Sequence, residues 1–260
     1  MSKLYSTIHK RVTELKGTYS IFIESPRDTI AMDENRVVPA ASVIKLGIMI
    51  EAYRLIDEGQ LNENDRITVR PSERVGGMGV LQHLHSVESL SIGDLMTLMI
   101  TQSDNTASNC LINMLGKDQI NHTIKRLGCT NTKLRRSFMD VESAKRGVDN
   151  TTCARDMVAM LKALSNTSEI LTSESSKKAI HTMKQQQLRG KLPYRIEGKS
   201  SFTLAHKTGE LQGVEHDVGI MNVRGEDVYI AVLLDQLPNN RLGKEAIGYI
   251  GEAIYRSLNE

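Results

Sequence analysis

Apolar and polar positions along the chain follow two periods, and the changes between them mark out the elements. Apolar residues recur at helical spacing from Leu4 to Leu15, which predicts an amphipathic helix over residues 3–16. Alternating patterns follow over residues 19–24 and 29–33, separated by a Ser-Pro-Arg-Asp turn. We therefore predict a β-hairpin after the first helix.

The central part of the chain has helical periodicity. Residues 42–57 are rich in Ile, Leu and Met and are followed by Gly59, so this helix should be buried on most sides. The other predicted helices are bounded by Ser, Asp, Asn or Gly and cover residues 91–102, 105–115, 117–127, 153–164 and 174–187.

After Gly198 the period of two returns, and the chain closes with a helix. Three antiparallel strands are predicted at residues 202–207, 216–222 and 228–235, with a turn at residues 224–227 between the last two. The final helix should cover residues 243–258.

Strands near both ends with helices between them predict an α/β (α+β) protein of two lobes. Sheet edges need partners and the terminal hairpin is too small alone, so strands from both ends should share one antiparallel sheet. We predict a discontinuous sheet-and-helix lobe from residues 1–38 and 190–260, and an inserted all-helical lobe from residues 39–189. The active site is expected in the cleft between the lobes.

Charge and length exclude several classes of partner. The 260 residues carry 33 Lys and Arg against 31 Asp and Glu, with no dense basic cluster interleaved with aromatics, so we expect no nucleic-acid partner. The longest apolar stretch near the start, residues 19–24, is far shorter than the roughly 20 residues that a membrane span needs. We expect no membrane partner, and the sequence leaves the oligomeric state open.

The N-terminus and the cysteines bear on compartment and cofactors. Charges interrupt the region where a secretory signal has its apolar core, so the chain as written is expected to be cytoplasmic; it is secreted or periplasmic if Met1 replaces a removed signal. Cys110, Cys129 and Cys153 are an odd number without a C-x-x-C pair, which indicates free, packed thiols. We expect neither a metal nor a cofactor.

Three short motifs carry the candidate chemistry: Ser42-Val-Ile-Lys45, Ser103-Asp-Asn105 and Lys207-Thr-Gly209. Positions i and i+3 share a helix face, so the Ser42 hydroxyl should lie within reach of the Lys45 amine. A lysine serves as a base only when its pKa falls well below about 10.4, and burial beside a second cation lowers it. Lys207 is the candidate for that cation, or for binding a substrate carboxylate.

Each motif alone has an ordinary structural explanation. Ser-x-x-Lys and Lys-Thr-Gly occur by chance in many proteins, and Asp104 or Asn105 can cap the helix that follows. The glycine-rich stretch at residues 76–79 lacks the context of a phosphate-binding loop, and we assign it to a loop bordering the cleft. The joint occurrence of three motifs in this order is what favours catalysis.

Four segments that include these motifs resemble the class A β-lactamases and related penicillin-recognising serine hydrolases: residues 39–45, 99–109, 149–157 and 206–209. The resemblance implies a β-lactamase-like fold and a small-molecule substrate, a β-lactam, ester or amide. It gives Ser42 the role of acylated nucleophile, Lys45 that of proton acceptor and Ser103 that of proton shuttle to the leaving nitrogen.

The resemblance also assigns the substrate-binding walls. Asn105 would bond the substrate's amide side chain, and Lys207, Thr208 and Gly209 would line the opposite wall. The oxyanion would be bound by the N–H groups of Ser42 and Glu210, with the helix start adding its dipole. The Glu210 side chain has no part in that role.

The chain departs from the family in the loop before Asp149. Class A enzymes have a deacylating glutamate there, within Arg-x-Glu-x-x-x-Asn. Counting back from Asp149 puts Ser137 at the glutamate position and Val141 at the asparagine position. Asp140 and Glu142 are substitute bases in principle, although solvated loop acids are the favoured interpretation.

A second departure follows the Lys-Thr-Gly strand. His216 and Asp217 stand where many class A enzymes have an arginine for the substrate carboxylate, and we expect a structural histidine there.

The leading hypothesis is a serine hydrolase that acts through an acyl-enzyme on Ser42 and hydrolyses a β-lactam or a related cyclic amide or ester. The alternatives are a penicillin-binding or sensor-like protein that is acylated without efficient turnover, and a cytoplasmic esterase or amidase. A cell-wall peptidase is disfavoured by the lack of a visible signal peptide.

Overall fold

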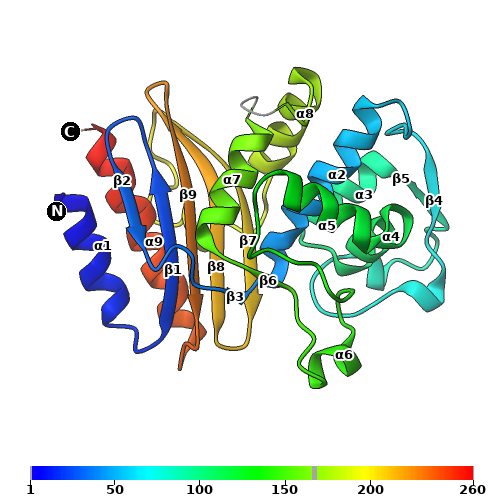
Figure 1. Cartoon of the computed structure of the whole chain (residues 1–260), viewed down its shortest axis with the longest axis horizontal. Helices are drawn as coiled ribbons and strands as arrows, with labels where there is room; N and C mark the ends of the chain where they lie inside the picture. Colours follow the sequence, from blue (N-terminus) through cyan, green and yellow to red (C-terminus); the bar gives the residue numbers. More distant parts are fainter. Residues whose placement is uncertain (1, 166–168, 260) are drawn as a thin grey trace.

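A five-stranded antiparallel sheet with helices on both faces organises the molecule (Figure 1). The computed structural model describes residues 2–165 and 169–259, so Met1, on which the expected compartment depends, lies outside the described residues. The strand order is β2-β1-β9-β8-β7, with bounds Thr29–Met32, Thr18–Glu24, Glu226–Asp235, Val214–Val223 and Phe202–Leu211.

Strands from the two ends of the chain meet in the middle of this sheet. β1 pairs with β9 in antiparallel register, from Thr18 opposite Asp235 to Glu24 opposite Tyr229. The predicted sheet built from both termini is therefore confirmed. β7 is longer than predicted and runs to Leu211, so the whole Lys-Thr-Gly motif lies on a strand.

The sheet is buried on both faces, and the side chains of β9 show the alternation. Ala231 and Leu233 join one apolar core, which lies under the central helices. Ile230 and Val232 join the other, which α1 (Lys3–Thr13) and α9 (Asn240–Asn259) cover. Figure 1 shows α1 and α9 together on one side of the sheet and α7 on the other. Successive strand residues point to opposite faces, so both layers are fixed by one sequence pattern.

The inserted segment contains the predicted helices, each within three residues of its expected ends. They are α2 Lys45–Asp57, α3 Ile92–Thr101, α4 Asn105–Leu115, α5 Lys117–Arg126, α7 Ala154–Leu164 and α8 Ser173–Lys184.

The same segment is not purely helical, and this corrects the expectation. Two short strand pairs lie in or reach into it: β3 (Val38–Pro39) with β6 (Thr151–Thr152), and β4 (Arg66–Thr68) with β5 (Ser89–Ser91). Strands of two or three residues are too short to show a period. The exact lobe boundaries stay a prediction.

Two further expectations can be compared with the described residues. Cys110, Cys129 and Cys153 are free and buried, as predicted, and burial raises the pKa of Cys110 and of Cys153 to about 11. In residues 2–165 and 169–259, no helix has the length and apolar character needed to cross a membrane.

Candidate active site

Ser42 lies on a tight turn at the start of the buried helix α2. Residues Ala41–Ile44 form the 3₁₀ turn η1, which runs directly into α2. Val43 N–H donates to the carbonyl of Ala40 at 3.2 Å, so the N–H of Ser42 precedes the first bond of the turn and has no acceptor within it. Ala41 has a φ of 45°, a strained conformation for a residue with a Cβ. The helix predicted over residues 42–57 is present, but its first turn is 3₁₀.

Hydrogen bonds from two other elements hold the chain just before Ser42. Ala40 N–H donates to the carbonyl of Asn150 at 2.8 Å, and His216 Nε2 lies 2.8 Å from the carbonyl of Pro39. Because Leu234 N–H donates to His216 Nδ1, the imidazole proton is on Nε2 and is given to Pro39. Burial lowers the pKa of His216 to about 4, so the ring is neutral and structural.

Lys45 is fully buried and its ammonium points to the start of α4. Lys45 Nζ donates to the carbonyl of Ser103 at 2.7 Å, to Ser103 Oγ at 3.1 Å and to Asn105 Oδ1 at 3.0 Å. Among the described residues no hydrogen bond joins it to Ser42, so direct proton exchange between the two stays a prediction. Burial, and then the charge of Lys207, hold the pKa of Lys45 well below its usual value.

Lys207 reaches the same serine from the sheet. Its Nζ donates to Ser103 Oγ at 3.0 Å and to the carbonyl of Thr208 at 2.8 Å, and the side chain is fully buried. Burial lowers the pKa of Lys207 to about 7, with a further lowering by Lys191 and an opposing effect of Asp217. A lysine with this pKa changes its charge near neutral pH.

Ser103 therefore links the two cations that the sequence predicted to converge. One hydroxyl oxygen accepts from Lys45 Nζ and from Lys207 Nζ. Ser103 has a φ of 53°, a strained backbone that directs its side chain between them. A hydroxyl bound in this way is suited to relay a proton, because both neighbours are nitrogen bases with lowered pKa values.

Asp104 fixes this corner of the molecule. Its Oδ1 accepts from Ala107 N–H at 3.0 Å as the cap of α4, which confirms the predicted cap. Its Oδ2 accepts from the N–H groups of Val80 and Leu81, at 2.7 and 2.9 Å. A Cβ on Gly79 would lie 2.3 Å from the Asp104 carboxyl group, so the close approach of this loop requires glycine.

Asn105 connects the same loop to Lys45. Its Oδ1 accepts from Lys45, and its Nδ2 donates to the carbonyl of Gly76 at 3.1 Å. Gly77 and Met78 line the same cavity as Ser42. The glycine-rich stretch thus borders the cleft, as predicted.

The end of β7 forms the opposite wall. A Cβ on Gly209 would lie 3.2 Å from Ala41 Cβ and from Val43 Cγ1, so the absence of a side chain lets the strand pack against the Ser42 turn. Thr208 is buried, and Glu210 lines the cavity. The Ser42 turn and the three residues predicted for the opposite wall are therefore adjacent.

The loop residue that faces Lys45 is Phe138, which corrects the expectation for Ser137. The Phe138 ring lies over the Lys45 ammonium, 4.3 Å from the ring centroid to Nζ. Asn109 binds the backbone of Phe138 on both sides: Nδ2 donates to its carbonyl at 3.0 Å, and Oδ1 accepts from its N–H at 2.8 Å. These bonds fix which residue of the loop points inward.

The base of the loop explains why counting back from Asp149 gave the wrong residue. The guanidinium of Arg136 forms the ion pair with the Asp149 carboxylate at 2.8 Å, whereas that of Arg135 reaches only the Asp149 carbonyl, at 3.3 Å. Asn150 Oδ1 accepts from the N–H groups of both arginines, at 2.7 and 3.0 Å. The loop register is therefore one residue later than predicted. Phe138 occupies the position assigned to Ser137, where the resemblance places a glutamate.

The two candidate bases, Asp140 and Glu142, both bond to residues of their own loop. Asp140 lines the cavity, but its Oδ1 accepts from the Ser143 N–H as the cap of the short helix α6 (Val141–Lys145). This hydrogen bond lowers the pKa of Asp140 below its usual value. A carboxylate with a lowered pKa is a weaker base. Glu142 pairs with Lys145 at 2.9 Å and is exposed. The two acids act locally, which agrees with their favoured interpretation as loop acids.

The residues at the position of the family's arginine are also occupied elsewhere. Asp217 accepts from His206 Nδ1 at 2.9 Å and from Leu192 N–H at 3.0 Å, and both it and His216 are fully buried. Neither lines the cavity that contains Ser42. The binding of a substrate carboxylate by Lys207 stays a prediction.

A cavity of about 320 Å³ joins the predicted elements. Ser42, Asn105, Phe138 and Glu210 all line it, so it is bounded by the Ser42 turn, the start of α4, the loop and the end of β7. This volume is at the lower end of the range for small-molecule sites.

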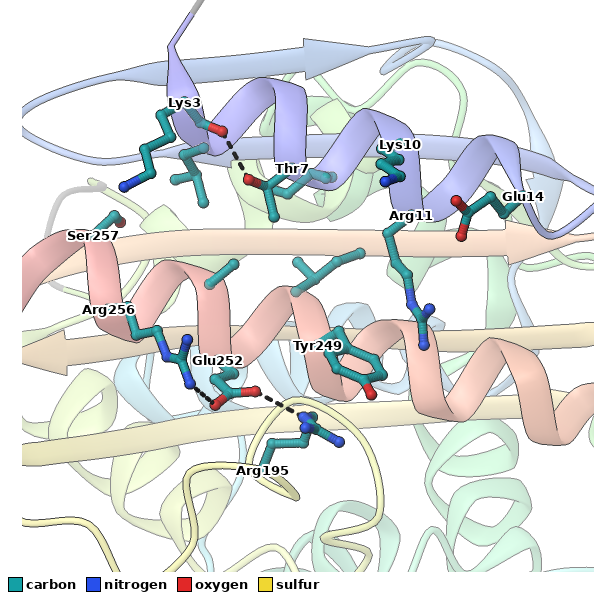
Figure 2. Close-up of a pocket in the computed structure, with 14 residues that line it drawn as sticks. Lys3, Thr7, Lys10, Arg11, Glu14, Arg195, Tyr249, Glu252, Arg256 and Ser257 are labelled. Atoms are coloured by element: carbon teal, nitrogen blue, oxygen red, sulfur yellow. Dashed lines mark hydrogen bonds and ion pairs between the residues drawn. The ribbon is translucent and has the colours of Figure 1, made fainter.

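A second cavity, of about 650 Å³, lies between α1 and α9 (Figure 2). There the guanidinium carbons of Arg11 and Arg195 lie 3.9 and 3.7 Å from the ring centroid of Tyr249. None of the three motifs contributes to its lining. The smaller cavity is therefore the candidate active site.

Two residues near the site were not found from the sequence. Phe138 packs on Lys45, and Lys191 is a buried cation close to the end of β7. An aromatic residue in a polar loop is a weak sign of a buried contact. Lys191 is a single lysine in the segment between a helix and a strand, and nothing in the sequence around it indicates that it is buried.

Comparison with known proteins gives one family. A sequence profile described as the Beta-lactamase enzyme family matches residues 3–258. The Beta-lactamase regulatory protein BlaB of Streptomyces cacaoi is 25% identical over 280 residues, which cover 90% of this chain and 89% of that protein.

Solved structures agree with this match. A β-lactamase from Sphaerobacter thermophilus has a TM-score of 0.92 and 30% identity, with 98% of each chain covered. A point mutant of PBP-A, solved as an acyl-enzyme complex with penicillin G, has a TM-score of 0.88 and 27% identity, covering 98% of this chain and 96% of that one. An ancestral class A β-lactamase shares the fold, with a TM-score of 0.89 at 19% identity over 98% of this chain and all of that one.

Proposed function

The chain belongs to the Beta-lactamase enzyme family, and from this premise we propose that it reacts with a β-lactam, or a related cyclic amide or ester, to form an acyl-enzyme on Ser42 that is released slowly. The observation that carries the proposal is the hydrogen-bonded chain from Lys45 through Ser103 to Lys207, beside a cavity that Ser42 lines. A serine is acylated efficiently only when its proton has an acceptor, and this chain supplies nitrogen bases with lowered pKa values.

Acylation proceeds as a proton transfer coupled to attack. Neutral Lys45 accepts the Ser42 proton while Ser42 Oγ bonds to the substrate carbonyl carbon. The N–H groups of Ser42 and Glu210 bind the oxygen as it becomes negative. When the carbon–nitrogen bond breaks, Ser103 gives its proton to the leaving nitrogen and is reprotonated by Lys45, so the proton lost by Ser42 ends on the product amine.

Lys207 contributes charge and hydrogen bonding at the opposite wall. In its protonated form it orients Ser103 and attracts the carboxylate that many β-lactams carry. In this protonated form it also disfavours protonation of Lys45, because two neighbouring ammonium groups repel each other.

Release of the acyl group needs a second base, one that activates water next to the ester. In this chain the loop residue beside Lys45 is the apolar Phe138, and Asp140 and Glu142 are engaged elsewhere. A phenyl ring cannot accept a proton and excludes water from the space that it fills. We therefore expect acylation to be faster than deacylation.

The relatives support the acylation part of the proposal. One structural relative is a mutant of PBP-A solved as an acyl-enzyme complex with penicillin G, and another is a β-lactamase. A relative with a regulatory name is consistent with a second candidate function, in which a long-lived acyl group acts as a signal. Phe138 is the specific observation that favours this second candidate over rapid hydrolysis.

Intact mass spectrometry combined with stopped-flow kinetics tests the proposal. Mixing the protein with penicillin G should add the mass of the whole antibiotic, and the adduct should persist after free antibiotic is removed. Ser42→Ala should form no adduct while still binding the antibiotic non-covalently. Rapid multiple turnover of a chromogenic cephalosporin would contradict the slow-release part, and an adduct on Ser42→Ala would contradict the assignment of the nucleophile.

A further inference from the structure

Lys191 is a third buried lysine at the end of β7, on the loop between α8 and the sheet. Its side chain is only 5% exposed. Lys191 Nζ donates to the carbonyl of Gly209 at 2.7 Å and to the carbonyl of His216 at 3.1 Å, and it forms an ion pair with Glu215 at 2.5 Å. Its charge is thus placed on two backbone carbonyls of the β7–β8 hairpin.

The loop that carries Lys191 is itself held against the sheet. The next residue, Leu192, donates its N–H to Asp217 Oδ2 at 3.0 Å, and its side chain is fully buried. Glu215 is fixed from the other side, because Asn240 Nδ2 donates to Glu215 Oε1 at 2.7 Å. The position of the Lys191 ammonium is therefore fixed at both ends, because the backbone next to Lys191 and its partner Glu215 are each held by hydrogen bonds.

The Gly209 carbonyl belongs to the same peptide group as the N–H of Glu210, the proposed second oxyanion donor. A trans peptide directs its C=O and N–H to opposite sides. An ammonium on the carbonyl side therefore leaves the N–H free to point away from it. β7 is an edge strand of the sheet, so one row of its backbone groups has no neighbouring strand.

We propose that Lys191 is a positioning residue for acylation: by holding and polarising the Gly209–Glu210 peptide group, it orients the N–H that binds the oxyanion and makes it a stronger donor. A charged donor on a carbonyl draws electron density from the amide and strengthens the hydrogen bond that its N–H gives. This inference rests on the proposed function, since it concerns the same acylation step.

Lys191 also acts on the charge of the site. After burial, the charge of Lys191 is the next largest cause of the lowered pKa of Lys207. Removing Lys191 should therefore raise the pKa of Lys207 and move the alkaline limb of the acylation profile to higher pH. Loss of the backbone contact should weaken the Glu210 N–H as a donor, whereas loss of the charge should shift the pH dependence of acylation.

The size of the effect on rate follows from the two contributions. Loss of a whole oxyanion donor slows catalysis by about 10²–10³-fold, and one neighbouring hydrogen bond changes the strength of another by roughly 10–30%. Lys191→Met should therefore slow acylation about two- to eight-fold, without changing the residue that is acylated. Lys191→Arg keeps the charge and should recover part of the rate.

The decisive readout is the infrared band of the acyl-enzyme ester carbonyl, measured with a β-lactam labelled with ¹³C at its reactive carbonyl. A weaker oxyanion donor leaves that carbonyl less polarised, so the band should move to higher wavenumber in Lys191→Met. A purely structural role would lower stability but would leave the band of the acylated, folded population in place.

Lys244→Met is the matched control. Lys244 Nζ lies 2.9 Å from Glu210 Oε1 and 3.7 Å from Glu215 Oε1, but it makes no bond to the Gly209 carbonyl. The variant Lys244→Met should therefore leave the infrared band of the ester carbonyl unchanged. If Lys191→Met folds poorly because Glu215 is left buried and charged, the double variant with Glu215→Gln removes both charges and should show the same shift.

The outcomes separate the two proposals. Absence of any adduct on the wild-type protein would overturn the proposed function itself. An adduct on Ser42 with identical carbonyl bands in wild type, Lys191→Met and the double variant would overturn the role of Lys191 alone. A shift in both lysine variants, including Lys244→Met, would assign the effect to general charge and would also overturn it.

Discussion

Replacing Phe138 by glutamate should convert slow release into turnover. The backbone at this position is held by Asn109, whose side chain binds both the N–H and the carbonyl of Phe138. These bonds do not involve the phenyl ring, so the substituted side chain should enter the same space. Phe138→Glu therefore places a carboxylate beside Lys45 and opens room for a water molecule next to the acylated serine.

The energies make this substitution tolerable for the fold. The ring centroid lies 4.3 Å from Lys45 Nζ, and a carboxylate about 4 Å from the protonated form of Lys45 is attracted by about 4 kcal/mol at an effective dielectric constant of about 20, before the cost of burying the carboxylate is subtracted. This offsets the lost cation–π contact, about 0.5–2 kcal/mol, and part of the lost burial. The new carboxylate should also raise the pKa of Lys45, so acylation at pH 7 should become somewhat slower.

The gain is expected in deacylation. A well-placed general base contributes about 10²–10⁴-fold to a step that involves proton transfer. Phe138→Gln is the matched control, because it opens the same space without supplying a base, and it should accelerate release by less than about tenfold.

The assay follows the acyl-enzyme over time by intact mass after a single acylation with penicillin G, while stopped-flow absorbance gives the acylation rate separately. Fast loss of the adduct is expected only in Phe138→Glu. Equal release rates in Phe138→Glu, Phe138→Gln and wild type, with all three folded and acylated, would refute the claim that Phe138 occupies the position of the missing base.

Further predictions concern charge and anchoring. The pKa of Lys207 is about 7 in the folded protein against 10.5 for an ordinary lysine, so at this group the unfolded chain binds more protons between these values. From pH 7 to pH 10 Lys207 should therefore add on the order of 4 kcal/mol to the free energy of unfolding, and urea titrations of Lys207→Met should lack this contribution. Asp104→Ala removes a helix cap and two loop bonds and should lower the urea-derived stability by about 2–4 kcal/mol, and a loss below 1 kcal/mol would contradict its anchoring role. Asp140→Ala should change the rate of adduct loss by less than about threefold, since Asp140 caps α6; a larger decrease would make it a deacylation base. The His216 ring, with a pKa of about 4, should show no NMR titration between pH 5.5 and pH 8, and a midpoint above pH 6 would contradict its neutral, structural assignment.

Much of the architecture was accessible from periodicity. The alternation in residues 202–235 predicted the hairpins of the sheet, and the pairing of β1 with β9 followed from the need of both terminal segments for a partner. A cap at Asp104 or Asn105 was predicted because these residue types satisfy the first N–H groups of a helix, and Asp104 is the one that caps α4. These features depend on local chemistry, which the sequence carries directly.

The convergence of Lys45, Ser103 and Lys207 came from the joint occurrence of three motifs and not from any one of them. Their exact bonding was not predictable. The sequence suggested that Lys45 faces Ser42, whereas its hydrogen bonds go to Ser103 and Asn105. Which of several nearby acceptors a buried ammonium selects depends on strained backbone such as Ser103, with φ of 53°, and periodicity contains no information on this.

The loop gave the clearest error. Counting residues back from Asp149 placed Ser137 at the reactive position, but the ion pair of Arg136 with Asp149 and the contact of Asn109 with Phe138 set the register one residue later. Long-range side-chain bonds decide register in a loop without secondary structure. Lys191 was missed for the same reason, since its burial results from tertiary contacts with Gly209 and His216.

The most direct test of the account is peptide mapping of the intact protein after exposure to penicillin G, with Ser42→Ala treated in parallel. One antibiotic-sized adduct is expected on the peptide that contains Ser42, persisting over many minutes, and none on Ser42→Ala. An adduct on another residue, or a folded wild-type protein that stays unmodified by penicillin G and by activated esters, would contradict the claim that these buried lysines and serines form an acylating centre.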